Sequence, residues 1–282
     1  MSTVGATVAA TGVPAPALPA GHYRATGVLR SEFTKLRTVR STVWSLLATV
    51  VLTVGIGVLA TAVESSRWSH LSLLDRLTFD PVSLSLTGLL FAQLALGVLG
   101  ILVVSGEYGT GSIRSTLAAV PNRPLVLAAK ALVFGVVALL VSEAVSFAAF
   151  LIGQSILSGT TPTASLSQGA ALRAVIGGGL YLTVLGLFAL GLAAILRHTA
   201  GAISAFVGVL LILPLIVEAL PSSVIQAVGK YLPANIGVAM TTVGHGREDF
   251  HAFPPWVGLG LLCGYAAAAL VVGGWVMVHR DA

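Results

Sequence analysis

The sequence predicts an all-α membrane protein, with six transmembrane helices, an N-terminal amphipathic interface helix and one short cytosolic helix. Of its 282 residues, 56% are hydrophobic and only 9% are charged, whereas an average soluble domain has about 25% charged residues. So few charges cannot cover the surface of a globular protein of this length. The excess apolar surface therefore has to face lipid, and the apolar residues fall into runs long enough to cross a bilayer.

A helix needs about 20 apolar residues to cross the hydrocarbon core. Six runs reach this length, and the third is long enough to begin in the cytosol. Only Arg197-His198-Thr199 separates the fourth run from the fifth, which predicts a tight turn there. Together the runs form one six-helix transmembrane domain over residues 43–282. The predicted spans are 43–63, 82–104, 125–157, 174–196, 200–220 and 256–278.

The basic residues predict the orientation, because Lys and Arg concentrate in cytosolic loops. With the N-terminus inside, ten of the 15 Lys and Arg residues are cytosolic, and they are densest just before the first span. An even number of spans then places both termini in the cytoplasm of a multi-pass protein of the cell membrane. The cytosolic set is Arg24, Arg30, Lys35, Arg37, Arg40, Arg114, Arg123, Lys130, Arg197 and Arg280.

Two segments precede the first span. Residues 1–25 are rich in Ala, Thr, Val and Pro, and we expect a flexible tail. In residues 26–42, Leu29, Phe33 and Leu36 recur at helical spacing among charged residues, which is typical of an amphipathic helix in the membrane interface. The alternative is a plain basic flank that only sets the topology.

No catalytic motif is apparent, and we expect a protein that is not an enzyme and holds no cofactor of its own. The phosphate-binding pattern GxxxxGK[ST] is absent, and the glycine-rich stretch at residues 106–112 lacks its lysine. His245 and His251 share an outer loop with Glu248 and Asp249. Such a group suits either a metal ion or a simple solvated loop, and we expect no metal.

Glu143 lies well inside the third run. An ionisable group in the middle of a membrane costs a few kcal/mol, so it usually faces a polar interior and often marks a transport pathway. A purely structural hydrogen bond, for example to Ser146, is the alternative. The sequence allows both interpretations of Glu143.

The loop after the second run predicts a short amphipathic helix. Ser112 is the expected N-cap, and Ile113, Leu117 and Val120 give one apolar face before Pro121 ends the helix. An apolar stripe exposed to the cytosol predicts contact with a protein partner or with the membrane surface.

Two motifs carry a family resemblance. EFTKLRTVRST at Glu32–Thr42 stands just before the first span, and EYGTGSIRSTL at Glu107–Leu117 follows the second and continues through Pro121, Arg123 and Lys130. With the six-span layout, the chain resembles an ABC transporter permease of the type-2 exporter class, and the motifs are similar to those of actinobacterial members. The resemblance covers nearly the whole chain after the N-terminal tail.

The resemblance implies that residues 26–42 are an interface helix in contact with membrane lipids through Phe33, Lys35, Leu36 and Arg37. It also implies a coupling helix that docks on a separate cytosolic ABC ATPase subunit, and short outer helices at residues 221–244. A second permease chain, identical or different, would complete the transport path, and no nucleic acid is expected as a partner. The implied ATPase-coupling residues are Glu107, Tyr108, Ile113, Arg114, Leu117 and Val120.

Two other functions remain open on the sequence alone. In an ion-gradient-driven secondary transporter Glu143 would carry a proton, but such proteins often show two related halves, and no convincing internal repeat is visible. The other is a membrane scaffold without transport.

Overall fold

The computed structural model describes residues 24–243 and 252–279, and within them all regular structure is helical. Six helices are long and apolar enough to cross a membrane, which confirms the all-α membrane fold and a multi-pass protein. The spans are Arg40–His70, α6 (Leu89–Gly109), α8 (Arg123–Leu157), α9 (Gly169–Leu196), Thr199–Glu218 and α14 (Pro255–His279). The predicted tail lies mostly outside the described residues.

The first span begins earlier and ends later than expected. Helix α1 (Ala25–Thr38) stops at Val39, whose backbone is extended (φ −78°, ψ 123°), so the predicted interface helix is shorter than 26–42. Arg40 already belongs to α2 (Arg40–Val50). A π-helical turn and α3 (Ile56–Arg67) then continue the same span.

The second span begins seven residues after its predicted start at Val82 because a separate short helix precedes it. Asp80 caps α5 (Pro81–Ser85) by accepting hydrogen bonds from the backbone N–H groups of Val82 and Ser83. Gly88 then lies directly against the carbonyl oxygens of the π-helical turn in the first span, where any side chain would collide with backbone. This close approach places the start of α6 at Leu89.

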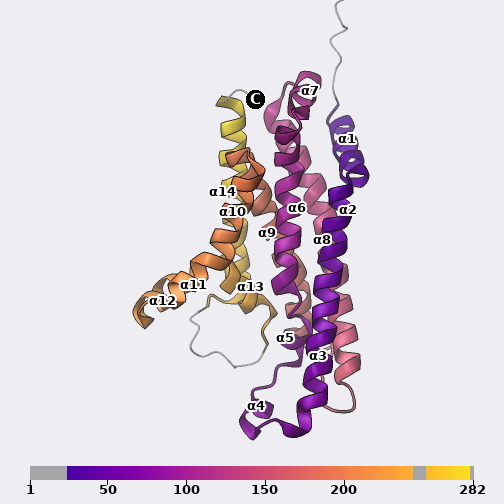
Figure 1. The fold of residues 1–282 in the computed structure, drawn as a ribbon, viewed down its shortest axis with the longest axis vertical. Helices are drawn as coiled ribbons and strands as arrows, with labels where there is room; N and C mark the ends of the chain where they lie inside the picture. Colours follow the sequence, from indigo (N-terminus) through magenta and orange to yellow (C-terminus); the bar gives the residue numbers. More distant parts are fainter. Residues whose placement is uncertain (1–23, 244–251, 280–282) are drawn as a thin grey trace, which may run out of the picture.

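Helix α9 is the centre of the bundle, with α6, α8 and α14 around it (Figure 1). Three consecutive glycines let three different elements approach it. A Cβ on Gly177 would meet Met240 of α13 (Pro233–Thr241), one on Gly178 would meet Leu89, and one on Gly179 would meet the carboxyl of Glu143. The small residues therefore bring helices into close contact, as is typical in lipid, where packing replaces the hydrophobic effect.

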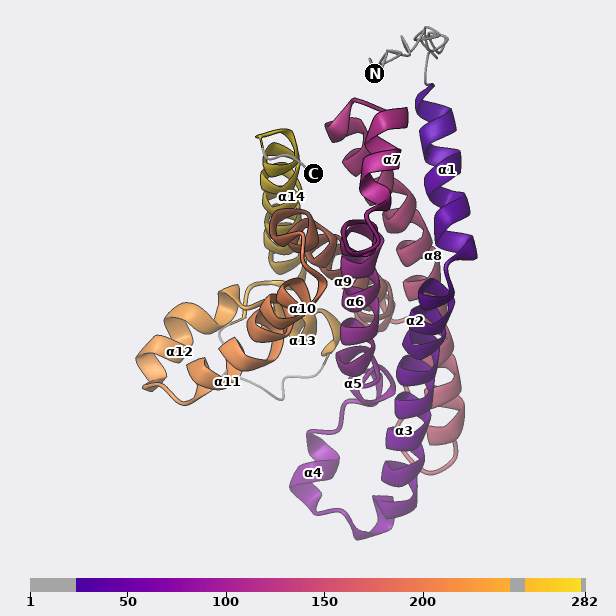
Figure 2. The ribbon, with the colours of Figure 1, turned by 45° about the horizontal axis from the view of Figure 1, so that its top comes forward.

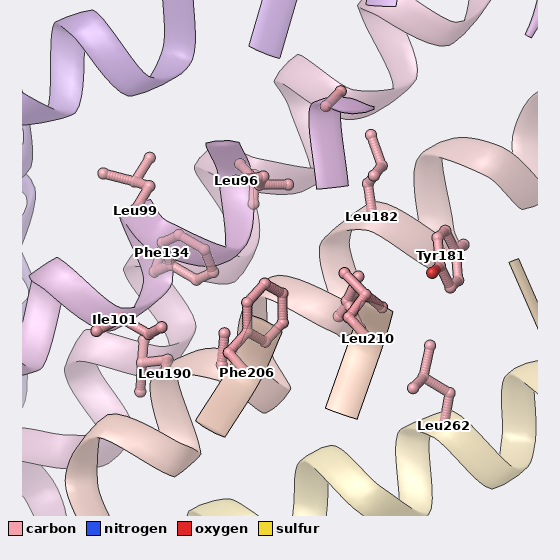
Figure 3. Packing of buried hydrophobic residues seen from close by; sticks show 14 of the residues in the cluster. Leu96, Leu99, Ile101, Phe134, Tyr181, Leu182, Leu190, Phe206, Leu210 and Leu262 are labelled. Atoms are coloured by element: carbon pink, nitrogen blue, oxygen red, sulfur yellow. The ribbon is translucent and has the colours of Figure 1, made fainter. Parts of the chain in front are cut away.

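Large side chains fill the core between these helices. Phe134 of α8 and Phe206 of α10 (Thr199–Val207) are fully buried, and each aromatic ring lies against a glycine, Gly186 and Gly97 respectively. Figure 3 shows both rings among the buried leucines of α6 and α9. The core is apolar and tightly packed, so polar groups inside it stand out.

The fifth span is, together with the first, the least covered by the rest of the chain. It runs through α10, a π-helical turn at Gly208–Ile212 and α11 (Leu213–Glu218). Pro214 explains the turn, because its ring displaces the carbonyl four residues earlier and it donates no hydrogen bond. Figure 2 shows α11 and α12 (Ser222–Val228) splayed away from the other helices.

Short helices flank the spans at the end of the bundle away from helix α7 (Ser112–Ala119). The connection after the first span holds α4 (Leu73–Leu77), which lies farthest from α7 in Figure 1. The short helices expected within 221–244 are present as α12 and α13. Asp80 accepts a hydrogen bond from the N–H of Val243, and Arg173 donates to the carbonyls of Met240 and Thr242, which ties the end of α13 to the bundle.

Candidate functional site

Four buried or half-buried charges meet at the α7 end of the bundle. We call Glu32, Lys35, Glu107 and Lys130 the charge cluster. The Lys130 ammonium lies 2.8 Å from Glu32 Oε2 and 2.6 Å from Glu107 Oε1. Lys35 Nζ lies 2.8 Å from Glu32 Oε1 and 2.7 Å from Glu107 Oε1. Two acids and two bases thus alternate around a closed ring with no net charge.

The helical repeat of α1 brings Glu32 into this cluster. Val28, Glu32 and Leu36 recur every four residues, so they share one face, and that face is buried against α8. On α8, the side chain of Lys130 is only 2% exposed. A buried ammonium needs partners, because removing one member of a buried ion pair leaves an uncompensated charge. Glu32 and Glu107 supply them from two other helices.

Lys35 links the charge cluster to α7. Its ammonium also lies 3.3 Å from the hydroxyl oxygen of Thr116 on α7. Partial burial by itself lowers the pKa of Lys35. The hydrogen bonds from Lys35 to Glu107 and Glu32, together with their negative charges, outweigh this and raise that pKa above its usual value. Lys35 therefore stays protonated through the physiological range.

Tyr108 makes a different set of contacts from its neighbour Glu107. The Arg197 guanidinium lies 5.4 Å from the centre of the Tyr108 ring, a cation–π distance. Arg197 also donates to the carbonyl of Val276 at 2.6 Å, and Arg123 donates to that of Met277 at 2.6 Å. The last turn of a helix leaves carbonyls without partners, and these two arginines satisfy two of them on α14.

Arg197 itself closes the tight turn that was predicted between the fourth and fifth spans. It adopts the left-handed conformation (φ 56°, ψ 12°), which ends α9 at Leu196. His198 then caps α10 by accepting the N–H of Gly201. A turn of two residues thus separates two spans, and its arginine points back to Tyr108 and α14.

Helix α7 differs from its prediction in two ways. Its N-cap is Gly111 (φ 72°), and Ser112 is the first helical residue, because the preceding turn needs the left-handed conformation that glycine adopts freely. Its apolar stripe does not face solvent, because Ile113 is only 3% exposed and joins the main core, with Leu117 packed beside it. Helix α7 therefore folds onto its own chain through Ile113 and Leu117, while Val120 stays half-buried.

A different face of α7 is available to a partner. Arg114, Ser115, Ala118 and Ala119 are exposed. Arg114 is thus the only predicted coupling residue of α7 that is fully accessible. The exposed face is small and carries one positive charge, and sequence reasoning missed Ala118 and Ala119 because alanine gives no chemical signal.

The predicted interface residues divide between two faces of α1. Leu36 is buried in the core, whereas Phe33 and Arg37 are exposed one turn apart. Phe33 is 51% exposed, a position suited to contact with lipid. Lys35 is engaged in the charge cluster instead of lying free at a membrane surface.

Glu143 lies far from the charge cluster along α8. Both of its carboxyl oxygens are shielded from solvent and have no hydrogen-bond partner within the described part of the chain. The carboxyl lies against Gly179 of α9. The alternative hydrogen bond to Ser146 is not formed, because Ser146 donates to the carbonyl of Val175. The hydroxyl of Ser142, the residue directly before Glu143, has no partner within the described residues either.

Comparisons with known proteins add no family to this picture. The chain matches no protein-family model and no curated protein.

The four residues of the suggested metal site, at positions 245 to 251, lie outside the described residues. Within 24–243 and 252–279, no group of three or more His, Cys, Asp or Glu side chains is placed to hold a metal ion.

Proposed function

We propose that this chain is the transmembrane permease subunit of an ATP-driven ABC exporter, with α7 as the contact for a separate cytosolic ATPase subunit. The observation that carries the proposal is the set of contacts that hold α7 and the adjoining end of α6 in place. Thr116 of this short helix contacts Lys35 of the charge cluster. The end of α6, which leads directly into α7, is held by Glu107 to α1 and α8 and by Tyr108 to the turn after α9. A merely connecting loop has no need of such fixation.

The contacts explain how a push on α7 would reach the spans. Glu107 and Tyr108 are consecutive residues of α6, so their side chains leave the helix in directions about 100° apart. Glu107 contacts α1 and α8, and Tyr108 contacts the turn between α9 and α10. A displacement of α7 and the end of α6 would therefore act on α1, α8, α9 and α10 together, which favours rigid-body movement.

A second permease chain is part of the proposal. The fifth span, like the first, has only 22% of its most apolar stretch buried within the chain, whereas α9 has 61%. Leu211, Ile212, Leu215 and Ile216 are exposed along it. A partner chain, identical or different, would cover part of this surface, and lipid the remainder. Both termini would lie in the cytoplasm.

An ion-gradient-driven secondary transporter is the second candidate, and Glu143 is the observation that favours it. A carboxyl without a partner among apolar helices suits proton binding. In that case transport would continue without an ATPase and would be lost in Glu143→Gln. A membrane scaffold, the third candidate, would show neither behaviour.

Co-purification of the chain with a candidate cytosolic ABC ATPase subunit tests the docking face. Ala118→Arg places a bulky charge on the exposed face of α7, and we expect it to reduce the retained ATPase at least about tenfold. Ala25→Arg, on the exposed first turn of α1, is the matched control and should retain it. Leu117→Asp is a poorer test, because Leu117 is half-buried and its loss would unfold α7.

The docking assignment is wrong if Ala118→Arg and Arg114→Glu both retain the ATPase at the wild-type level. Thermal unfolding of each variant in detergent shows whether the helix bundle is intact. Loss of ATPase in the Ala25→Arg control as well would point to a general defect and would also count against a specific role of α7.

A further inference from the structure

An apolar groove runs along the bundle between α8, α9 and α14, on the half that carries α7. Its volume is about 810 Å³. Leu132 and Val136 of α8 and Val271 and Trp275 of α14 are all at least 50% exposed along it, so the groove opens sideways toward lipid. Thr183 is one of its few polar residues, and its hydroxyl donates to the carbonyl of Gly179.

Glu143 lies just beyond the inner end of this groove. On α8 the groove ends at Leu139, and Glu143 follows about one turn later, four residues along the same face. On α9 it ends at Thr183, and Gly179, which contacts the Glu143 carboxyl, is four residues before it. One helical turn is about 5.4 Å. The carboxyl is therefore within short electrostatic range of anything bound at this end.

No cation within the described residues lies within hydrogen-bonding distance of the Glu143 carboxyl. On α8, Lys130 is held in the charge cluster and Arg123 by the carbonyl of Met277. On α9, Arg173 donates to the end of α13, and Arg197 to α14. His279 lies at the opposite end of the groove, beside the carbonyl of Trp275. The Glu143 carboxyl near the groove thus lacks a counter-ion within the described residues.

We infer that the groove binds a hydrophobic organic cation that enters from the bilayer, with its positive charge near Glu143. The apolar walls match the body of such a molecule, and the unpaired carboxyl matches its charge. Interactions of this kind are strong in a low-dielectric environment. The inference names a substrate class and in that respect rests on the proposed exporter function, but binding itself needs neither the ATPase nor ATP.

Equilibrium dialysis of the full chain in nanodiscs tests this, with tetraphenylphosphonium as the probe and protein-free nanodiscs subtracted. We expect saturable binding that Glu143→Gln weakens about tenfold, equivalent to about 1.4 kcal/mol. Glu218→Gln is the matched control, because it removes an exposed carboxylate at the end of α11, and it should bind normally. Tetraphenylborate has the same shape and the opposite charge, and should show no saturable binding.

A second variant tests the groove without touching the carboxyl. Gly135→Trp adds a large side chain to the groove lining beside Leu187, and should abolish saturable binding. If tetraphenylborate binds equally, or if Glu143→Gln and Gly135→Trp both leave phosphonium binding unchanged, the groove holds only lipid and the inference is wrong. Binding without ATPase docking would overturn the exporter function alone, and docking without binding would overturn the groove assignment alone.

Discussion

The carboxyl groups of Glu32 and Glu143 are both buried, but in opposite circumstances. Glu32 reaches two lysines within 2.8 Å at the α7 end of the bundle. Glu143 touches a glycine backbone in the middle of α8 and has no partner within the described residues. The contrast suggests that the paired charges connect helices in this protein, whereas the unpaired carboxyl of Glu143 is free to interact with a ligand.

Lys130→Met should have the largest effect, because it removes the buried lysine of the charge cluster and leaves two glutamates with only the partly exposed Lys35. Removing one partner of a buried ion pair costs about 3–5 kcal/mol. Chemical or thermal unfolding in detergent should show a loss of this size. Glu143→Gln replaces a carboxyl that has no partner within the described residues by a neutral amide, and should leave the stability unchanged or slightly higher. A loss below about 1 kcal/mol in Lys130→Met would mean that the charge cluster contributes little.

Gly179→Ala, beside the unpaired carboxyl of Glu143, should have an intermediate effect on stability. A Cβ there would lie 2.6 Å from Glu143 Cδ, too close for a normal contact. Overpacking of this kind typically costs about 1–3 kcal/mol, measured by the same unfolding assay. The double variant Gly179→Ala with Glu143→Ala should recover most of the loss. Gly260→Ala is the control, because its Cβ would meet open space, and a loss there as large as in Gly179→Ala would contradict the steric explanation.

Lys35→Met should have the smallest effect, although Lys35 contacts the same two glutamates as Lys130. Its side chain is 39% exposed, and solvent screens such pairs, so we expect a loss of about 1 kcal/mol or less. Because its pKa is raised in the folded protein, the contribution is fully present below the ordinary lysine pKa of about 10.4. It disappears as the pH rises through the folded value. A difference between variant and wild type that changes between pH 6 and 9 would contradict this origin.

The membrane fold was predictable because lipid imposes a length and a composition on every span. Residues 125–157 and 256–278 agree with the observed α8 and α14 to within two residues at each end. The start of α6 was not predictable, since an apolar run does not reveal that Gly88 packs against another backbone. The direction of the α7 stripe was missed for the same reason: periodicity shows that Ile113 and Leu117 share a face, but not which surface that face meets.

The candidate site was only half visible in the sequence. Glu107, Tyr108 and Lys35 were singled out, but as contacts for partners, whereas the structure brings the two charged residues together with Glu32 and Lys130 from distant positions in the chain. The sequence by itself determined the number of spans and the presence of an isolated acid in the third, because both follow from local hydropathy. Only the tertiary structure decided which charges are neutralised, because neutralisation depends on which helices pack side by side.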